Sequence, residues 1–188
     1  MDVVSEVISL YERHGDDDYL GESVSKTQHS IQCALLAEEE GYGDEVILGA
    51  FLHDIGHLIG ADQGLDRMVT DGVNLGANNH DVIGGEFLRQ RGFPKLVCDL
   101  VQGHVQAKRY LVWKNRSYRE NLSAASKMTL EHQGGPMTDN EAEVFEHSEM
   151  FDLIIKMRTW DERGKDVSIR DVSLDKYKTL CRKVLNIS

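Results

Sequence analysis

The sequence is poor in cysteine and proline, and each scarcity argues against a class of protein. Only three cysteines occur among 188 residues, Cys33, Cys98 and Cys181. They are widely spaced and form no CxxC pair, which argues against a disulfide framework or a zinc–thiolate site and favours reduced core thiols. The two prolines, Pro94 and Pro136, leave long stretches open to helix formation.

Long apolar runs and an excess of basic residues are also missing. No run approaches the roughly 20 apolar residues that a transmembrane helix needs. The acidic, interrupted pattern after Met1 does not resemble a signal peptide, so a cytoplasmic protein without a membrane partner is expected. A formal net charge of -11 argues against a nucleic-acid partner, which would need a basic face. That charge does not exclude an anionic small substrate, because a few basic residues can still line a pocket.

Apolar residues recur with the helical period of about 3.6 along most of the chain, which predicts an all-α protein. The expected helices span approximately residues 3–15, 25–40, 44–54, 80–90, 94–108, 123–132, 138–161 and 173–185. Residues 59–79 are the least regular stretch, and their glycines predict a long loop. No linker or internal repeat divides the chain, so a single domain over residues 1–188 is expected.

The stretch around which the chain is organised is residues 51–57, FLHDIGH. An adjacent pair, His53-Asp54, lies in an apolar run, and His57 follows one helical turn later. An imidazole and a carboxylate are ligands for a borderline or hard metal ion. Taken alone, this dipeptide is better explained as a helix end that has one solvated Asp and two core histidines.

Further histidines change that interpretation, because they lie beside apolar residues on four successive predicted helices. Helices packed in a bundle can project such side chains inward to a shared metal site. The spacing of the candidates resembles the H…HD…D pattern of the HD-domain superfamily, a family of helical bundles. The predicted metal ligands are His29, His53, Asp54, His80, His104 and Asp161.

Two metals account for this number of ligands better than one. We expect one ion to be held by His29, His53, Asp54 and Asp161, and a second by Asp54, His80 and His104. Asp54 would then bridge the two ions, and the second ion would keep open positions. All-nitrogen and oxygen ligation is compatible with iron, manganese and other metals, so the ligands alone leave the metal open.

Three potential cations accompany these ligands at helical spacing. His57 follows His53 by four residues, Lys108 follows His104 by four, and Arg158 precedes Asp161 by three. Individually, each could be an ordinary surface or helix-end residue. Together they suggest an anionic substrate group, of which a phosphonate or phosphate is the simplest candidate. Ser126 could add a hydroxyl donor.

At this level of detail the sequence resembles the C–P-cleaving phosphonate oxygenases. These are mixed-valent di-iron enzymes of the HD-domain superfamily and distant relatives of myo-inositol oxygenase. The resemblance covers roughly residues 19–165. It is carried by YLGE at 19–22, HDIGH at 53–57, the spacing of 104 and 108, SAAS at 123–126, QGGPM at 133–137 and RTWD at 158–161.

The resemblance implies specific roles for the residues around the metals. His57, Lys108, Ser126 and Arg158 would hold the phosphonate, and Tyr19 would guard the open coordination site of the second iron. Glu22 would face a cationic nitrogen of the substrate. Without the resemblance, Tyr19 and Glu22 would be read as an exposed loop pair. The implied cofactors are two iron ions in the Fe(II)/Fe(III) state, with O2 as co-substrate.

The implied substrate is a small zwitterionic organophosphonate. The reaction would cleave the C–P bond of a 1-hydroxy-2-(amino or trimethylammonio)ethylphosphonate, giving phosphate plus glycine or glycine betaine. Candidate aromatic residues near the motifs slightly favour the trimethylammonio form, which is held by carboxylates and aromatic faces. Two alternatives stay open: an HD-domain phosphohydrolase acting on a nucleotide or phosphate ester, and a metal-containing binding module without turnover. The sequence does not give the oligomeric state.

Overall fold

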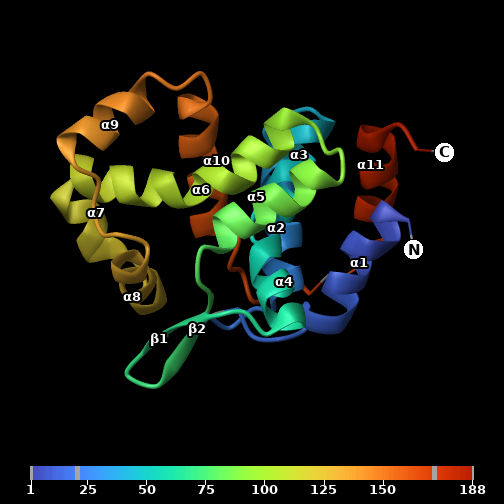
Figure 1. Cartoon of the computed structure of the whole chain (residues 1–188), viewed down its shortest axis with the longest axis horizontal. Coiled ribbons are helices and arrows are strands. Elements are labelled where there is room, and N and C mark those ends of the chain that lie inside the picture. The colour runs from blue at the N-terminus through green and yellow to red at the C-terminus, as the bar shows by residue number, and fades with distance from the viewer. Residues whose placement is uncertain (1, 20–21, 171–172, 188) are drawn as a thin grey trace.

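Helices form most of the structure, a computed structural model that describes residues 2–19, 22–170 and 173–187 (Figure 1). The helices are α1 (Val3–His14), α2 (Lys26–Glu39), α3 (Asp44–Leu52), α4 (Ile55–Gln63), α5 (His80–Gln90), α6 (Lys95–Lys114), α7 (Arg116–Asn121), α8 (Ala124–His132), α9 (Asp139–Glu146), α10 (Phe151–Arg163) and α11 (Asp175–Leu185). Two short antiparallel strands, β1 (Arg67–Thr70) and β2 (Val73–Ala77), make a hairpin. The predicted helical fold is therefore confirmed, with this hairpin as an addition.

The long helix α6 is the centre of the arrangement and packs against α3, α5 and α10. Helix α2 packs on α3 and α10, and α4 packs on α5. In Figure 1, α1 and α11 lie together at one side of the molecule, α7 to α9 lie at the opposite side, and the hairpin projects below. Within the described ranges, no helix combines the length and the apolar composition needed to cross a membrane.

Side-chain caps define where several helices begin. Ser25 and Gln28 form a capping box at the start of α2, and Thr138 and Glu141 form another at α9. The hydroxyl of Ser123 accepts a hydrogen bond from the backbone N–H of Ser126 at the start of α8. These caps stand at starts that the sequence predicts, because a hydroxyl ahead of a helical apolar pattern satisfies a backbone N–H that the helix leaves unpaired.

The His-Asp pair lies at a break between two helices. Helix α3 ends at Leu52 and α4 begins at Ile55, so His53 and Asp54 form the short connection between them. A glycine follows because α5 approaches closely: a Cβ on Gly56 would lie 1.8 Å from the carbonyl oxygen of His80. The break lets adjacent side chains reach one site, which a continuous helix opposes by turning successive residues about 100° apart.

Two of the predicted elements were wrong. Residues 59–79 are not a long loop: α4 continues to Gln63, and the β hairpin follows. Asp71 and Gly72 connect its strands with φ values of 49° and 79°, the conformation that a tight hairpin turn requires. The Asp-Gly dipeptide is therefore the turn signal in this stretch.

The second error is the expected helix over residues 138–161. It divides into α9 and α10, because the hydroxyl of Ser148 accepts the backbone N–H of Met150. The rings of Phe145 and Phe151 meet edge to face across this break, with 5.1 Å between their centroids. Apolar periodicity continues through the break because both rings reach the same core, so the pattern alone resembles one helix.

Candidate metal centre

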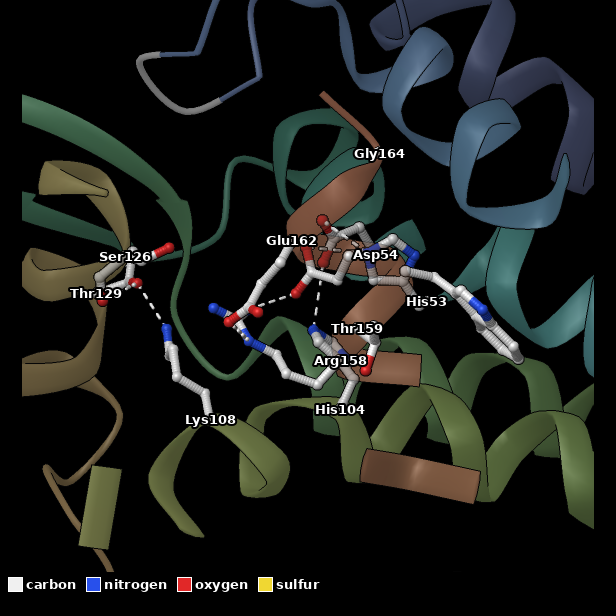
Figure 2. A network of polar contacts seen from close by, with 12 residues as sticks. His53, Asp54, His104, Lys108, Ser126, Thr129, Arg158, Thr159, Glu162 and Gly164 are labelled. Atoms are coloured by element: carbon white, nitrogen blue, oxygen red, sulfur yellow. Dashed lines mark hydrogen bonds and ion pairs between the residues drawn. The ribbon is translucent and has the colours of Figure 1, made fainter. Parts of the chain in front are cut away.

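Six buried donor side chains converge inside the helical bundle. They come from α2, from the break between α3 and α4, from the start of α5, from α6 and from α10: His29, His53, Asp54, His80, His104 and Asp161. Each is at most 7% exposed. Figure 2 shows His53, Asp54 and His104 gathered beside Arg158. The structure thus brings together all the residues predicted as metal ligands.

Four of the donor atoms form a first group. His29 Nε2 lies 3.2 Å from His53 Nε2 and 3.3 Å from Asp161 Oδ1. Asp54 Oδ2 lies 3.3 Å from His53 Nε2 and 3.8 Å from His29 Nε2. Neighbouring ligand atoms about 2.1 Å from one ion stand roughly 3.0–3.4 Å apart, so three of these spacings fit a single metal, and the distance between His29 and Asp54 is somewhat longer.

The other oxygen of Asp54 belongs to a second group. Oδ1 lies 3.4 Å from His80 Nε2 and 3.3 Å from His104 Nε2, and those two nitrogens are 3.1 Å apart. One carboxylate therefore presents one oxygen to each group, which is the arrangement of a bridging ligand. With three protein donors, the second group leaves positions open for other ligands.

Backbone carbonyls fix the orientation of three of the histidines. The Nδ1 atoms of His29, His53 and His104 lie 2.8, 2.8 and 2.7 Å from the carbonyl oxygens of Gly164, Ala50 and Val101. A carbonyl only accepts, so Nδ1 donates and the Nε2 of each neutral ring carries a lone pair. This is the ring form that a metal ligand needs.

The same constraint shows that the donor set fits a cation. The Nε2 atoms of His29 and His53 face each other, and when both rings are neutral their two lone pairs cannot hydrogen-bond. Asp54 Oδ2 is buried and has no hydrogen-bond partner within the ranges that the structure describes. Buried polar atoms are nearly always satisfied. A metal ion among these atoms would satisfy the two nitrogens and the oxygen together.

The charges around His53 also favour a bound cation. Burial lowers the pKa of His53, but the carboxylates of Asp54 and Asp161 outweigh burial and raise it to about 9. Burial raises the pKa of Asp161, whereas the Arg158 guanidinium outweighs this and holds it well below its usual range. The carboxylates of Asp54 and Asp161 therefore favour a cation among these donors, and a metal would displace the proton from His53.

Proximity alone groups two other side chains with these donors. Cys33 lies near His29 and His53, and His57 lies near Asp54 and His80. Burial raises the pKa of the Cys33 thiol well above its usual value, so the thiolate that a metal needs is disfavoured. Cys33 is therefore not a preferred ligand, although it is close.

His57 differs from the ligand histidines in its hydrogen bonding. The expected common helix face with His53 is wrong, since the break between α3 and α4 separates them. The backbone N–H of Ala77, at the end of β2, donates to His57 Nδ1 over 3.1 Å. In the neutral ring the proton is then on Nε2, which lies 4.0 Å from Asp54 Oδ1. His57 is thus a hydrogen-bond donor at the edge of the second group.

A narrow cavity of about 40 Å³ opens onto Asp54, His80, His104 and Asp161. Its walls include every residue that the sequence predicts for substrate contact: Tyr19, Glu22, His57, Lys108, Ser126 and Arg158. The sequence interpretation missed Thr129, Gln133 and Lys165, which line the same cavity. Thr129 follows Ser126 by one helical turn, so that spacing was an available signal.

Lys108 is the cation at the α8 side of this cavity. Its Nζ donates to the hydroxyl of Thr129 over 2.8 Å, and Figure 2 shows this pair close to Ser126. Burial lowers the pKa of Lys108, the Arg158 guanidinium lowers it further, and the resulting value is about 7. An anion bound beside Lys108 would therefore stabilise the charged form of its side chain.

Arg158 is less free than the sequence suggests. Its Nη1 binds Asp161 Oδ2, and its Nε lies 2.9 Å from the Tyr118 hydroxyl and 3.1 Å from Glu162 Oε1. The guanidinium thus holds one oxygen of Asp161 while the other oxygen faces the histidines. Arg158 lines the cavity as predicted and also orients a candidate metal ligand.

Tyr19 and Glu22 are not an exposed loop pair. The Tyr19 ring is stacked on His29, with 3.9 Å between centroids, and its hydroxyl lies 3.4 Å from Asp161 Oδ1. Tyr19 therefore lies against the first donor group while it lines the cavity. The carboxylate of Glu22 accepts a hydrogen bond from Lys165 Nζ over 2.8 Å. Lys165 outweighs the effect of burial and lowers the pKa of Glu22.

Comparison with known proteins agrees with this geometry. The sequence model of the HD-domain family matches residues 27–174. The chain therefore belongs to the HD-domain family, in the group that includes the phosphonate dioxygenases named next. It is 39% identical over 163 residues to [1-hydroxy-2-(trimethylamino)ethyl]phosphonate dioxygenase (glycine-betaine-forming) of Leisingera caerulea, covering 87% of this chain and 80% of that protein.

Two further relatives match over most of their length. Hydroxymethylphosphonate dioxygenase of Gimesia maris is 34% identical over 177 residues, which are 94% of this chain and 85% of that protein. Uncharacterized protein L432 of Acanthamoeba polyphaga mimivirus is 40% identical over 185 residues, which are 98% of this chain and 83% of that protein.

Proposed function

We propose that this protein is an O2-dependent oxygenase that cleaves the C–P bond of a small organophosphonate. The observation that carries the proposal is the position of Asp54, whose two oxygens face two separate donor groups beside a cavity with cationic walls. The dioxygenase names of two relatives support the same reaction class. We propose cytoplasmic location and iron, in the mixed-valent state, for both ions.

The ligand roles follow the two donor groups. His29, His53 and Asp161 would hold one iron, His80 and His104 would hold the other, and Asp54 would bridge them. The all-nitrogen and oxygen donor set suits iron, as it also suits other divalent metals. When bound, the iron pair supplies the oxidising chemistry with O2, which side chains cannot provide.

The chain's own residues would bind and orient the substrate. His57, whose neutral ring carries its proton on Nε2, and Lys108 both line the cavity, so both could donate to phosphonate oxygens. Ser126 would add a hydroxyl, and Arg158 would add positive charge. Thr129 positions the ammonium of Lys108. Burial of this cradle strengthens each of these interactions, because little water competes.

The substrate would be a 1-hydroxyphosphonate. The zwitterion 1-hydroxy-2-(trimethylammonio)ethylphosphonate, giving phosphate and glycine betaine, is slightly preferred over its 2-amino analogue, which would give glycine. Glu22 supports a cationic substrate, because its carboxylate lies in the wall of the same cavity as the basic cradle. The name of the Gimesia maris relative adds hydroxymethylphosphonate, a 1-hydroxyphosphonate without a cationic group, as a further candidate substrate.

The test is anaerobic loading with Fe(II), incubation with each phosphonate, and then addition of O2. The proposal predicts phosphate release only after O2 enters. A phosphohydrolase would share the two-metal centre and the anion cradle, but it would release phosphate from an ester without O2 and with redox-inert metals. Phosphate release that does not depend on O2 would therefore contradict the oxygenase proposal and support the phosphohydrolase.

A further inference from the structure

The ammonium group of Lys165 lies between a carboxylate and an aromatic ring in this structure. Its ammonium hydrogen-bonds the Glu22 carboxylate over 2.8 Å and lies 5.7 Å from the centre of the Tyr19 ring. A carboxylate together with an aromatic face is the environment that binds ammonium and quaternary ammonium groups. The protein thus fills its own cation-binding position with a side chain.

The same ion pair lines two cavities. Glu22 and Lys165 line the narrow cavity at the metal ligands and also a second cavity of about 290 Å³. Ser126 and Arg158 line both cavities as well. The second cavity adds Tyr118 and Glu162, an aromatic ring and another carboxylate. A cationic group on that side would find the carboxylates of Glu22 and Glu162, each of which is paired with a cation in this structure.

The pair is accessible enough to be exchanged. The side chains of Lys165 and Glu22 are 22% and 21% exposed, so neither charge is locked in a dry interior. Partly exposed ion pairs are weak because water competes for both partners. A substrate nitrogen arriving at Glu22 can therefore displace the ammonium of Lys165 toward solvent.

We propose that Lys165 is a specificity-determining residue, which competes with the cationic nitrogen of a substrate for the carboxylate of Glu22. This inference rests on the proposed function, since it concerns the phosphonates that the site accepts. With Lys165 paired, Glu22 is neutralised and a phosphonate without a cation is tolerated. When a cationic substrate binds, its nitrogen replaces the ammonium and the carboxylate remains neutralised. Lys165 thereby lets one pocket accept both kinds of phosphonate.

Opposite substitutions should shift the selectivity in opposite directions. Lys165→Met removes the competitor, so the trimethylammonio substrate should bind a few-fold more tightly, because it no longer has to break a partly exposed ion pair worth about 1 kcal/mol or less. Hydroxymethylphosphonate should bind several-fold more weakly, because the bare Glu22 carboxylate repels it. Glu22→Gln should reverse both changes. Lys165→Arg keeps the charge and should stay near the wild-type ratio.

The experiment measures anaerobic dissociation constants of both phosphonates on the iron-loaded protein, together with kcat/KM in air. Lys176→Met is the matched control, since Lys176 also pairs with a carboxylate, Glu38, but lines neither cavity. A thermal melt of each variant separates lost folding from changed binding, and the opposite shift in Glu22→Gln carries the test if Lys165→Met does not fold.

The outcomes separate the inference from the proposed function. Opposite changes for the two substrates in Lys165→Met, with none in Lys176→Met, support competition. Equal weakening of both substrates would make Lys165 a phosphonate ligand, and no change would make the pair a surface contact; either result overturns the inference while leaving the oxygenase proposal intact. Wild-type protein that binds phosphonates without O2-dependent phosphate release would instead overturn the proposed function.

Discussion

The metal centre and the cavity beside it are built in different ways. Most candidate ligands project from helices of the bundle, and backbone carbonyls hold three of the rings through Nδ1. The cavity takes its other side chains largely from the periphery: Tyr19 and Glu22 precede α2, Lys165 follows α10, and the end of the hairpin orients His57. Chemistry common to the family would thus depend on the rigid interior, and substrate choice on segments that can vary.

The largest effect is expected from Asp54, the residue that joins the two donor groups. Asp54→Asn keeps the size of the side chain but weakens a ligand to both metals, so activity should fall by at least about 100-fold. Metal analysis after iron loading should show loss from both positions. Retention of two metals in Asp54→Asn would break the account of a bridging carboxylate.

A smaller and more selective effect is expected from the second donor group. His80→Ala or His104→Ala should reduce the metal content from about two ions per chain to about one, because the first group keeps its donors. His147→Ala is the matched control, since His147 is an exposed histidine outside the site. Two metals in both site variants would contradict the assignment of the second ion.

The cavity residues should alter binding while leaving the metals in place. Lys108→Met should raise the KM for phosphonates by roughly 10- to 100-fold, the size expected for a charged hydrogen bond. Thr129→Val keeps the ammonium and should cost only a few-fold, because it removes one of the contacts that position Lys108. Unchanged KM in Lys108→Met, or lost metal in either variant, would contradict the distinction between the metal ligands and the cavity residues.

The smallest effect is a proton taken up on binding. Without substrate, the pKa of Lys108 is about 7, so its amine is mostly neutral at pH 8. A bound phosphonate anion favours the charged form and raises this pKa, so binding at pH 8 should consume protons, whereas binding at pH 6 should consume few. Calorimetry in buffers of different ionisation enthalpy measures the uptake. Lys108→Arg, which is always charged, should abolish it; persistent uptake would point to another group.

The sequence predicted the interior better than the periphery, for a physical reason. The ligand histidines lie on helices with clear apolar periodicity, so their convergence follows from packing one face inward. Lys165 lies after the end of α10, and its partner Glu22 is 143 residues away. No local pattern can indicate such a pair. The break at His53-Asp54 was also missed, because the apolar run continues through it and periodicity does not report a change in helix direction.

The most direct test of the central claim is iron-edge anomalous scattering from crystals of the protein loaded with Fe(II) without O2. The account predicts two iron peaks, one beside each oxygen of Asp54. One peak should have His29, His53 and Asp161 as neighbours, and the other His80 and His104. A single peak, or a second peak held by Cys33 or His57 in place of these residues, would contradict it.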